Sequence, residues 1–246
     1  MKRSNWLLYL AVALVVLSTL VYVIHFAIFR DVHHIFIYLV GDIAFVPIEV
    51  LLVTVIIHRL LGQREKRALL NKLNMVIGAF FNEVGTDLLK RIIALDEDFD
   101  GVRQNLLINK DWTHRDFAQT RNRMAEYDYT IEVEPETLNE LRDFLLAKRE
   151  FLLRLLENPN LLEHESFTEL LWAVTHLAEE LAHRDGAYDL PAADYEHLAG
   201  DIRRAYVRII GEWLEYMEHL QRKYPYLFSL AIRTNPFDPT ASAEIT

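Results

Sequence analysis

Two long apolar runs open the chain, and residues 6–29 carry no formal charge over 24 positions. As a helix this run is about 36 Å long, enough to cross a hydrocarbon core of about 30 Å. A second run, residues 35–61, is interrupted by Asp42, Pro47 and Glu49. We expect two transmembrane helices, about 6–29 and 35–61. A secretory signal fits the first run poorly, because the run is too long and no small-residue cleavage site follows it.

The distribution of Lys and Arg predicts how these helices are oriented. Lys2 and Arg3 precede the first helix, whereas the turn between the helices holds only Arg30. Five more basic residues follow the second helix: Arg59, Arg64, Lys66, Arg67 and Lys72. Basic residues concentrate on the cytoplasmic side, so we expect a two-pass protein of the inner (cytoplasmic) membrane with both termini cytoplasmic. The five basic residues form an expected collar against lipid headgroups.

Beyond the membrane the apolar positions follow a helical period. Leucine, valine and phenylalanine recur at steps of three and four in Leu69, Leu73, Val76, Phe80, Val84 and Leu88. This spacing predicts one apolar face of a juxtamembrane helix over 62–95, which either continues directly from the preceding helix or joins it at Gly62. The acidic stretch 96–101 ends it.

Residues 96–233 are expected to form an acidic helical bundle. Thr113 with Asp116, and Ser166 with Glu169, have the spacing of helix caps, and Pro135 suits a first helical position. The longest helix is expected over 192–223, and the single alternating stretch, 129–135, is too short for a sheet. The predicted fold class is all-α: a two-helix transmembrane hairpin followed by a cytoplasmic helical bundle.

The Pro-rich tail, residues 234–246, is expected to fray. Within it, Asn235-Pro236-Phe237 is either a peptide docking motif or a place where Phe237 packs against the bundle.

Charge and cysteine content exclude several classes of site. Residues 73–246 hold 18 Lys and Arg against 32 Asp and Glu, a net charge of −14. Nucleic acid is therefore not an expected partner, since phosphates require a basic face. The chain has no cysteine, which excludes thiol catalysis, disulfides and thiolate metal sites.

Two carboxylates inside the second apolar run are the first candidate site. Asp42 and Glu49 are seven residues apart and share one helix face. Ser18 and Thr19 are expected near the level of Glu49, and His25 near Asp42. Carboxylates at such depth are costly and are functional hypotheses by default. They either line a proton or cation pathway in an oligomer or hydrogen-bond neighbouring helices.

The stretch DEDFDG is a second candidate, because Asp96, Asp98 and Asp100 have the spacing of a calcium loop. The twelfth position, where a bidentate Glu belongs, is Leu107. A solvated acidic turn is therefore favoured, with no calcium binding tighter than about millimolar.

The third candidate is the strip His176, Glu180 and His183. Glu180-x-x-His183 has the spacing of carboxylate-bridged di-iron bundles, but a second such pair is missing. The strip lies mostly opposite the expected buried face of Phe167, Leu170, Val174, Leu177 and Leu181. The sequence favours a solvated strip over a metal site.

The sequence contains no nucleophile elbow, phosphate-binding glycine loop or dinucleotide fingerprint. We therefore expect a non-enzymatic integral membrane protein without a cofactor, acting as a homo-oligomeric scaffold or regulatory interaction module. The first alternative is a subunit of a cation or proton channel that uses Asp42 and Glu49. The second is a membrane-tethered metal sensor.

Overall fold

The computed structural model describes residues 4–159, 161 and 164–244, with the backbone alone described at 4, 5, 7 and 65–71. The chain divides into two compact units, residues 1–66 and 67–246, called here the hairpin unit and the helical domain. Both units are built from helices. Among the described residues, the β-type pairing is limited to one isolated bridge between Asp96 and Ile131. The predicted all-α class is confirmed, and residues 129–135 are the expected extended connector.

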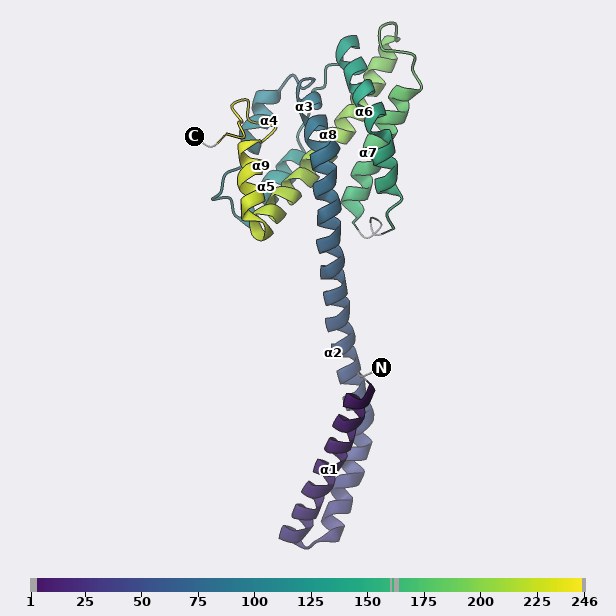
Figure 1. The fold of residues 1–246 in the computed structure, drawn as a ribbon, viewed down its shortest axis with the longest axis vertical. Helices are drawn as coiled ribbons and strands as arrows, with labels where there is room; N and C mark the ends of the chain where they lie inside the picture. Colours follow the sequence, from purple (N-terminus) through teal and green to yellow (C-terminus); the bar gives the residue numbers. More distant parts are fainter. Residues whose placement is uncertain (1–3, 160, 162–163, 245–246) are drawn as a thin grey trace. The chain divides into compact units, whose positions relative to one another are not determined.

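The hairpin unit contains α1 (Ser4–Phe29) and the first part of α2 (Val32–Phe80), which run side by side (Figure 1). Arg30 adopts a positive φ of 50° in the turn between them. Asp31 then caps α2, since its Oδ1 accepts the backbone N–H groups of His33 and His34 at 2.9 and 3.2 Å. Leu8–Phe29 and Val32–Arg64 are long and apolar enough to cross a membrane, by length and composition.

α2 continues directly through Gly62 to Phe80, so the juxtamembrane helix extends the second apolar helix and no joint forms at Gly62. A π-helical turn, η1 (Phe81–Gly85), and then α3 (Thr86–Ile93) follow without a break. Gly85 allows the Phe rings to close over this turn. A Cβ there would lie only 2.6 Å from Cδ1 of Phe81 and 2.7 Å from Cε1 of Phe80.

The helical domain is built around α8 (Ala192–Lys223), which packs against α3, α5, α7 and α9 (Figure 1). The other helices are α4 (Phe99–Leu106), α5 (His114–Ala125), α6 (Pro135–Leu156), α7 (Glu165–Ala182) and α9 (Pro225–Arg233). The predicted apolar faces are buried: Phe80, Val84 and Leu88 are fully inaccessible, as are Phe167, Leu170, Val174 and Leu177. Burial of these faces provides the driving force for the bundle.

Two of the three predicted helix starts are confirmed. Thr113 and Asp116 form a reciprocal capping box at α5, and Pro135 occupies the first turn of α6. The cap predicted at Ser166 is wrong, because α7 begins at Glu165 and its N-cap is His164. The Nδ1 atom of His164 accepts the backbone N–H of Phe167 at 3.4 Å.

The tail does not fray at its start. Asn235 is buried and its Nδ2 donates to the carbonyl oxygen of Leu106 at 2.9 Å. Phe237 is fully buried, with its ring 5.0 Å from that of Trp213. The Asn235-Pro236-Phe237 segment is therefore part of the domain core, which corrects the predicted boundary at residue 234.

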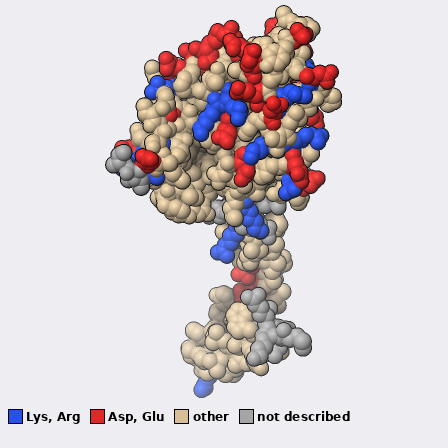
Figure 2. Space-filling model, turned by 45° about the horizontal axis from the view of Figure 1, so that its top comes forward, with Lys and Arg blue, Asp and Glu red and all other residues tan. Residues whose placement is uncertain are grey.

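Acidic side chains spread over the face of the helical domain seen in Figure 2, with Lys and Arg among them. The helices of the hairpin unit show few charged side chains in the same view. The charge contrast seen in the sequence is therefore a property of the folded surface.

Candidate metal centre

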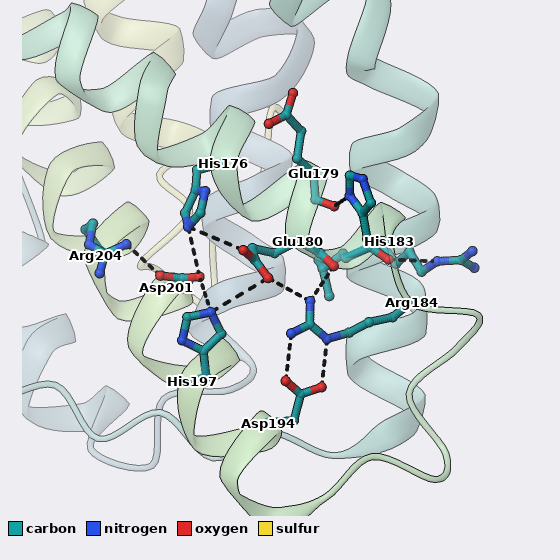
Figure 3. A network of polar contacts seen from close by, with 11 residues as sticks. His176, Glu179, Glu180, His183, Arg184, Asp194, His197, Asp201 and Arg204 are labelled. Atoms are coloured by element: carbon teal, nitrogen blue, oxygen red, sulfur yellow. Dashed lines mark hydrogen bonds and ion pairs between the residues drawn. The ribbon is translucent and has the colours of Figure 1, made fainter.

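Two pairs of ligand-type side chains face each other across the α7–α8 interface (Figure 3). His176 and Glu180 are four residues apart on α7, and His197 and Asp201 are four residues apart on α8. Side chains with this spacing lie on one side of a helix, one turn apart. Packing of α7 against α8 brings the two pairs together.

Three members of this cluster, His176, Glu180 and Asp201, each offer a ligand atom within 4.8 Å of the other two. The Nε2 atoms of His176 and His197 each lie 3.4 Å from Oδ2 of Asp201. They lie 3.8 and 3.7 Å from the two carboxylate oxygens of Glu180. For metal–ligand bonds of about 2.0–2.1 Å, neighbouring ligand atoms of a tetrahedron are about 3.3–3.4 Å apart. The two distances to Asp201 match this spacing, whereas the two distances to Glu180 are longer and involve different carboxylate oxygens.

Two arginines hold the carboxylates in place. Arg184 donates to Glu180 at 2.8 Å and makes a bidentate pair with Asp194 at 2.7 and 2.8 Å. The hydrogen bond from Arg184 keeps the pKa of Glu180 below its usual value. Arg204 donates to Oδ1 of Asp201 at 2.6 Å. Such outer contacts orient the ligands of protein metal sites.

Asp201 is the buried member of the cluster, only 2% exposed, and its Oδ2 makes no hydrogen bond. His176 and His197 are about half exposed, at 46% and 52%. A buried carboxylate oxygen without a hydrogen bond is costly, and a cation would satisfy it. The exposed imidazoles give a metal ion a route between this site and solvent.

The sequence prediction identified part of this cluster. His176 and Glu180 belong to it, whereas His183 lies apart, with its Nδ1 2.7 Å from the backbone oxygen of Glu179. His176 and His183 are exposed and Glu180 is partly exposed, as in the solvated strip that the sequence favours, while His176 and Glu180 also face Asp201 at the helix interface. The repeated His-x-x-x-carboxylate spacing on consecutive helices is the sequence signal that makes His197 and Asp201 further candidates, although it does not show that the two pairs meet.

The DEDFDG aspartates do not converge on a common point. Asp96 is 7% exposed, and its Oδ1 accepts the N–H of Asp98 at 3.2 Å. Asp98 accepts a hydrogen bond from Tyr127, and Asp100 lies 3.7 Å from Arg103. Among the described residues, none of the three belongs to a group with metal-ligand spacing. The described structure therefore does not support a metal site at Asp96, Asp98 and Asp100.

The hairpin unit contains a cavity of about 570 Å³ between its helices, lined by Ser18, His25 and Asp42 among others. The rings of His25 and His34 stack there, with centroids 5.9 Å apart. Glu49 is not among its lining residues, and the hydroxyl of Thr19 donates to its own helix at Val15. A pathway through Asp42 and Glu49 stays a prediction.

The basic collar is only partly described. Arg59, Arg64 and Lys72 are exposed, as contact with headgroups requires. The side chains of Lys66 and Arg67 lie outside the described residues.

Comparison with known proteins places the whole chain in one family. Residues 69–233 match a family model described as "Uncharacterized protein MJ1433, C-terminal helical domain", and residues 2–61 match "MJ1433, N-terminal helical domain". The chain belongs to the MJ1433 family. The MJ1433 protein of Methanocaldococcus jannaschii is 49% identical over 238 residues, covering 97% of this chain and 96% of the relative. No solved structure matches the chain. The two MJ1433 family domains correspond closely to the hairpin unit and the helical domain.

Proposed function

We propose that this protein is a non-enzymatic, membrane-anchored regulatory module whose helical domain responds to a divalent transition-metal ion. The metal binds His176, Glu180, His197 and Asp201 and fastens α7 to α8. The observation that carries this proposal is the convergence of both imidazole Nε2 atoms on the buried Oδ2 of Asp201, at 3.4 Å each.

The ligand set indicates the class of metal. Two imidazoles and two carboxylates suit Zn²⁺ and its neighbours in the first transition series, rather than Ca²⁺ or Mg²⁺, which prefer oxygen alone. Four protein ligands fill a tetrahedron and leave no open position for a substrate. This closed arrangement supports a structural or sensing role over a catalytic one.

The two apolar segments support the anchor. Leu8–Phe29 and Val32–Arg64 have the length and composition of membrane spans, and their side chains are exposed rather than packed in a core. The positions of Lys and Arg favour a two-pass arrangement in the cytoplasmic membrane with the helical domain in the cytoplasm. We further propose that the protein acts as a homo-oligomer, since the exposed hairpin offers apolar and polar surface for neighbouring copies.

Zn²⁺ binding to the detergent-solubilised full chain tests the centre. The protein is stripped with a chelator, dialysed against buffered Zn²⁺ and analysed for metal content. We expect the variant H176A/H197A to lose one Zn²⁺ per chain relative to the unmodified protein. The matched control H183A, which changes a nearby exposed histidine outside the cluster, should lose none. Equal metal content in H176A/H197A and the unmodified protein would overturn the proposal.

A further inference from the structure

A second group of ligand-type side chains lies elsewhere on the same pair of helices. His164 is the N-cap of α7, and Glu212 and Glu215 are three residues apart on α8. One ligand atom from each of the three lies within 4.8 Å of the other two. His164 and His176 are twelve residues apart, about 18 Å along the chain by helical rise, so this cluster is separate from the first.

Glu212 distinguishes this cluster from a group of exposed acidic residues, because its side chain is buried. The residue is 3% exposed, and its Oε2 is buried without a hydrogen-bond partner. Arg121 donates to Glu215 at 2.6 Å and so balances one of the two carboxylates. Among the described residues, no basic group forms an ion pair with Glu212. Ser166 hydrogen-bonds the carboxylate of Glu212, but its buried Oε2 has no partner, and an unsatisfied buried oxygen is costly.

We infer that His164, Glu212 and Glu215 form a second site for a divalent transition-metal ion. One imidazole and two carboxylates, without sulfur, suit Zn²⁺, Mn²⁺ or Fe²⁺. A cation at this point supplies the partner that Oε2 of Glu212 lacks. With Arg121 already paired to Glu215, a divalent ion brings the local charge from −1 to +1.

Binding at this site is coupled to the start of α7. The Nδ1 atom of His164 lies 3.4 Å from the backbone nitrogen of Phe167, which it caps, and 3.3 Å from Oγ of Ser166. A metal on Nε2 would leave the ring proton on Nδ1, and a metal on Nδ1 would take the lone pair that accepts from Phe167. In either case the N–H of Phe167 would lose its cap. Occupation of this site therefore changes the first turn of α7.

This inference extends the proposed function, but a separate set of ligands carries it. The two sites lie toward opposite ends of α7, one at its first turn and one in its last turns. Metal ions in both would hold α7 to α8 at two places.

Metal counting in the full chain distinguishes the two sites. After chelation and dialysis against Zn²⁺, we expect two ions per unmodified chain, one in E212Q and one in H176A/H197A. The combined variant should bind none. The control E169Q, which changes an exposed carboxylate on α7 outside both clusters, should retain two.

The outcomes separate failure of this site from failure of the first. Unchanged metal content in E212Q, or no metal in H176A/H197A, would overturn the second site. A single ion that is lost in E212Q but kept in H176A/H197A would support it and overturn the first. If E212Q loses helicity by circular dichroism, H164N replaces it, since Asn keeps an N-cap acceptor but removes the imidazole. We expect H164N to bind one ion, and two ions would count against the site.

Discussion

Asp96 is a residue whose environment differs from what its sequence pattern suggests. Its carboxyl is almost fully buried, and its Oδ2 makes no hydrogen bond. Desolvation raises the pKa of Asp96, although the hydrogen bond from the N–H of Asp98 and the nearby hydroxyl of Tyr206 partly offset this. The groups around it are acidic or neutral, namely Asp98 and the phenols of Tyr127, Tyr129 and Tyr206. Folding therefore favours the protonated form of Asp96.

This environment predicts a pH-dependent stability difference for D96N. Protonation of Asp96 contributes to the free energy of unfolding. This contribution is fully present below the unfolded pKa of 3.8 and is lost as pH rises through the higher folded pKa. At pH 7 we expect D96N to be more stable than the unmodified protein, because Asn carries no charge and its amide oxygen still accepts from Asp98. The higher stability of D96N relative to the unmodified protein should disappear as the pH approaches 4. Urea denaturation between pH 4 and 7, with chelator present, measures it.

The exposed residue Asp100 provides the control for this experiment. D100N should change the free energy of unfolding by less than about 0.5 kcal/mol at each pH. A loss of stability at pH 7 in D96N would show instead that the charged carboxylate is needed by the fold.

Individual site residues were predictable only in part. The sequence pairs His176 with Glu180 through their spacing along one helix. It does not reveal that Asp201 and His197 meet them, because this depends on the register between α7 and α8. That register is set by buried side chains such as Leu177 and Ile202, whose packing no local pattern encodes.

Helical elements were easier to predict where strong local signals mark their ends. The predicted range 192–223 agrees with α8, which begins after Pro191 and ends before Pro225. Gly62 does not interrupt α2, because one glycine costs a helix only about 1 kcal/mol, which neighbouring turns offset. Packing of Phe237 was one of two alternatives for the tail, and the sequence could not choose between them because this burial depends on Leu106 and Trp213, both distant in the sequence.

The C-terminal segment predicts a large effect from one aromatic side chain. Phe237 is fully buried against Trp213, so F237A should lower the free energy of unfolding by about 3–5 kcal/mol. Chemical denaturation followed by circular dichroism measures this change. The exposed neighbour Pro239 is the control, with less than about 0.5 kcal/mol expected for P239A. A similarly small effect of F237A would contradict the packed tail.

On the scale of the whole molecule, the positions of Lys and Arg predict the topology. A reporter fused after Thr246 should be cytoplasmic, and one inserted between Asp31 and His33 should be external. Reporter pairs active on only one side of the membrane, such as a fluorescent protein and alkaline phosphatase, measure this directly. An external C-terminus would reverse the proposed orientation and expose the helical domain to the outside.

The arginine contacts around the first cluster have a further consequence. Arg184 donates to both Glu180 and Asp194, and Arg204 donates to Asp201, so the domain can fold without metal at the proposed centre. A ligand that binds only the folded state adds about 2.7 kcal/mol of stability at a free concentration one hundred times its Kd. The proportion of molecules open to proteolysis would then fall about a hundredfold. The survival of the protein would thus follow the supply of free metal in a graded manner.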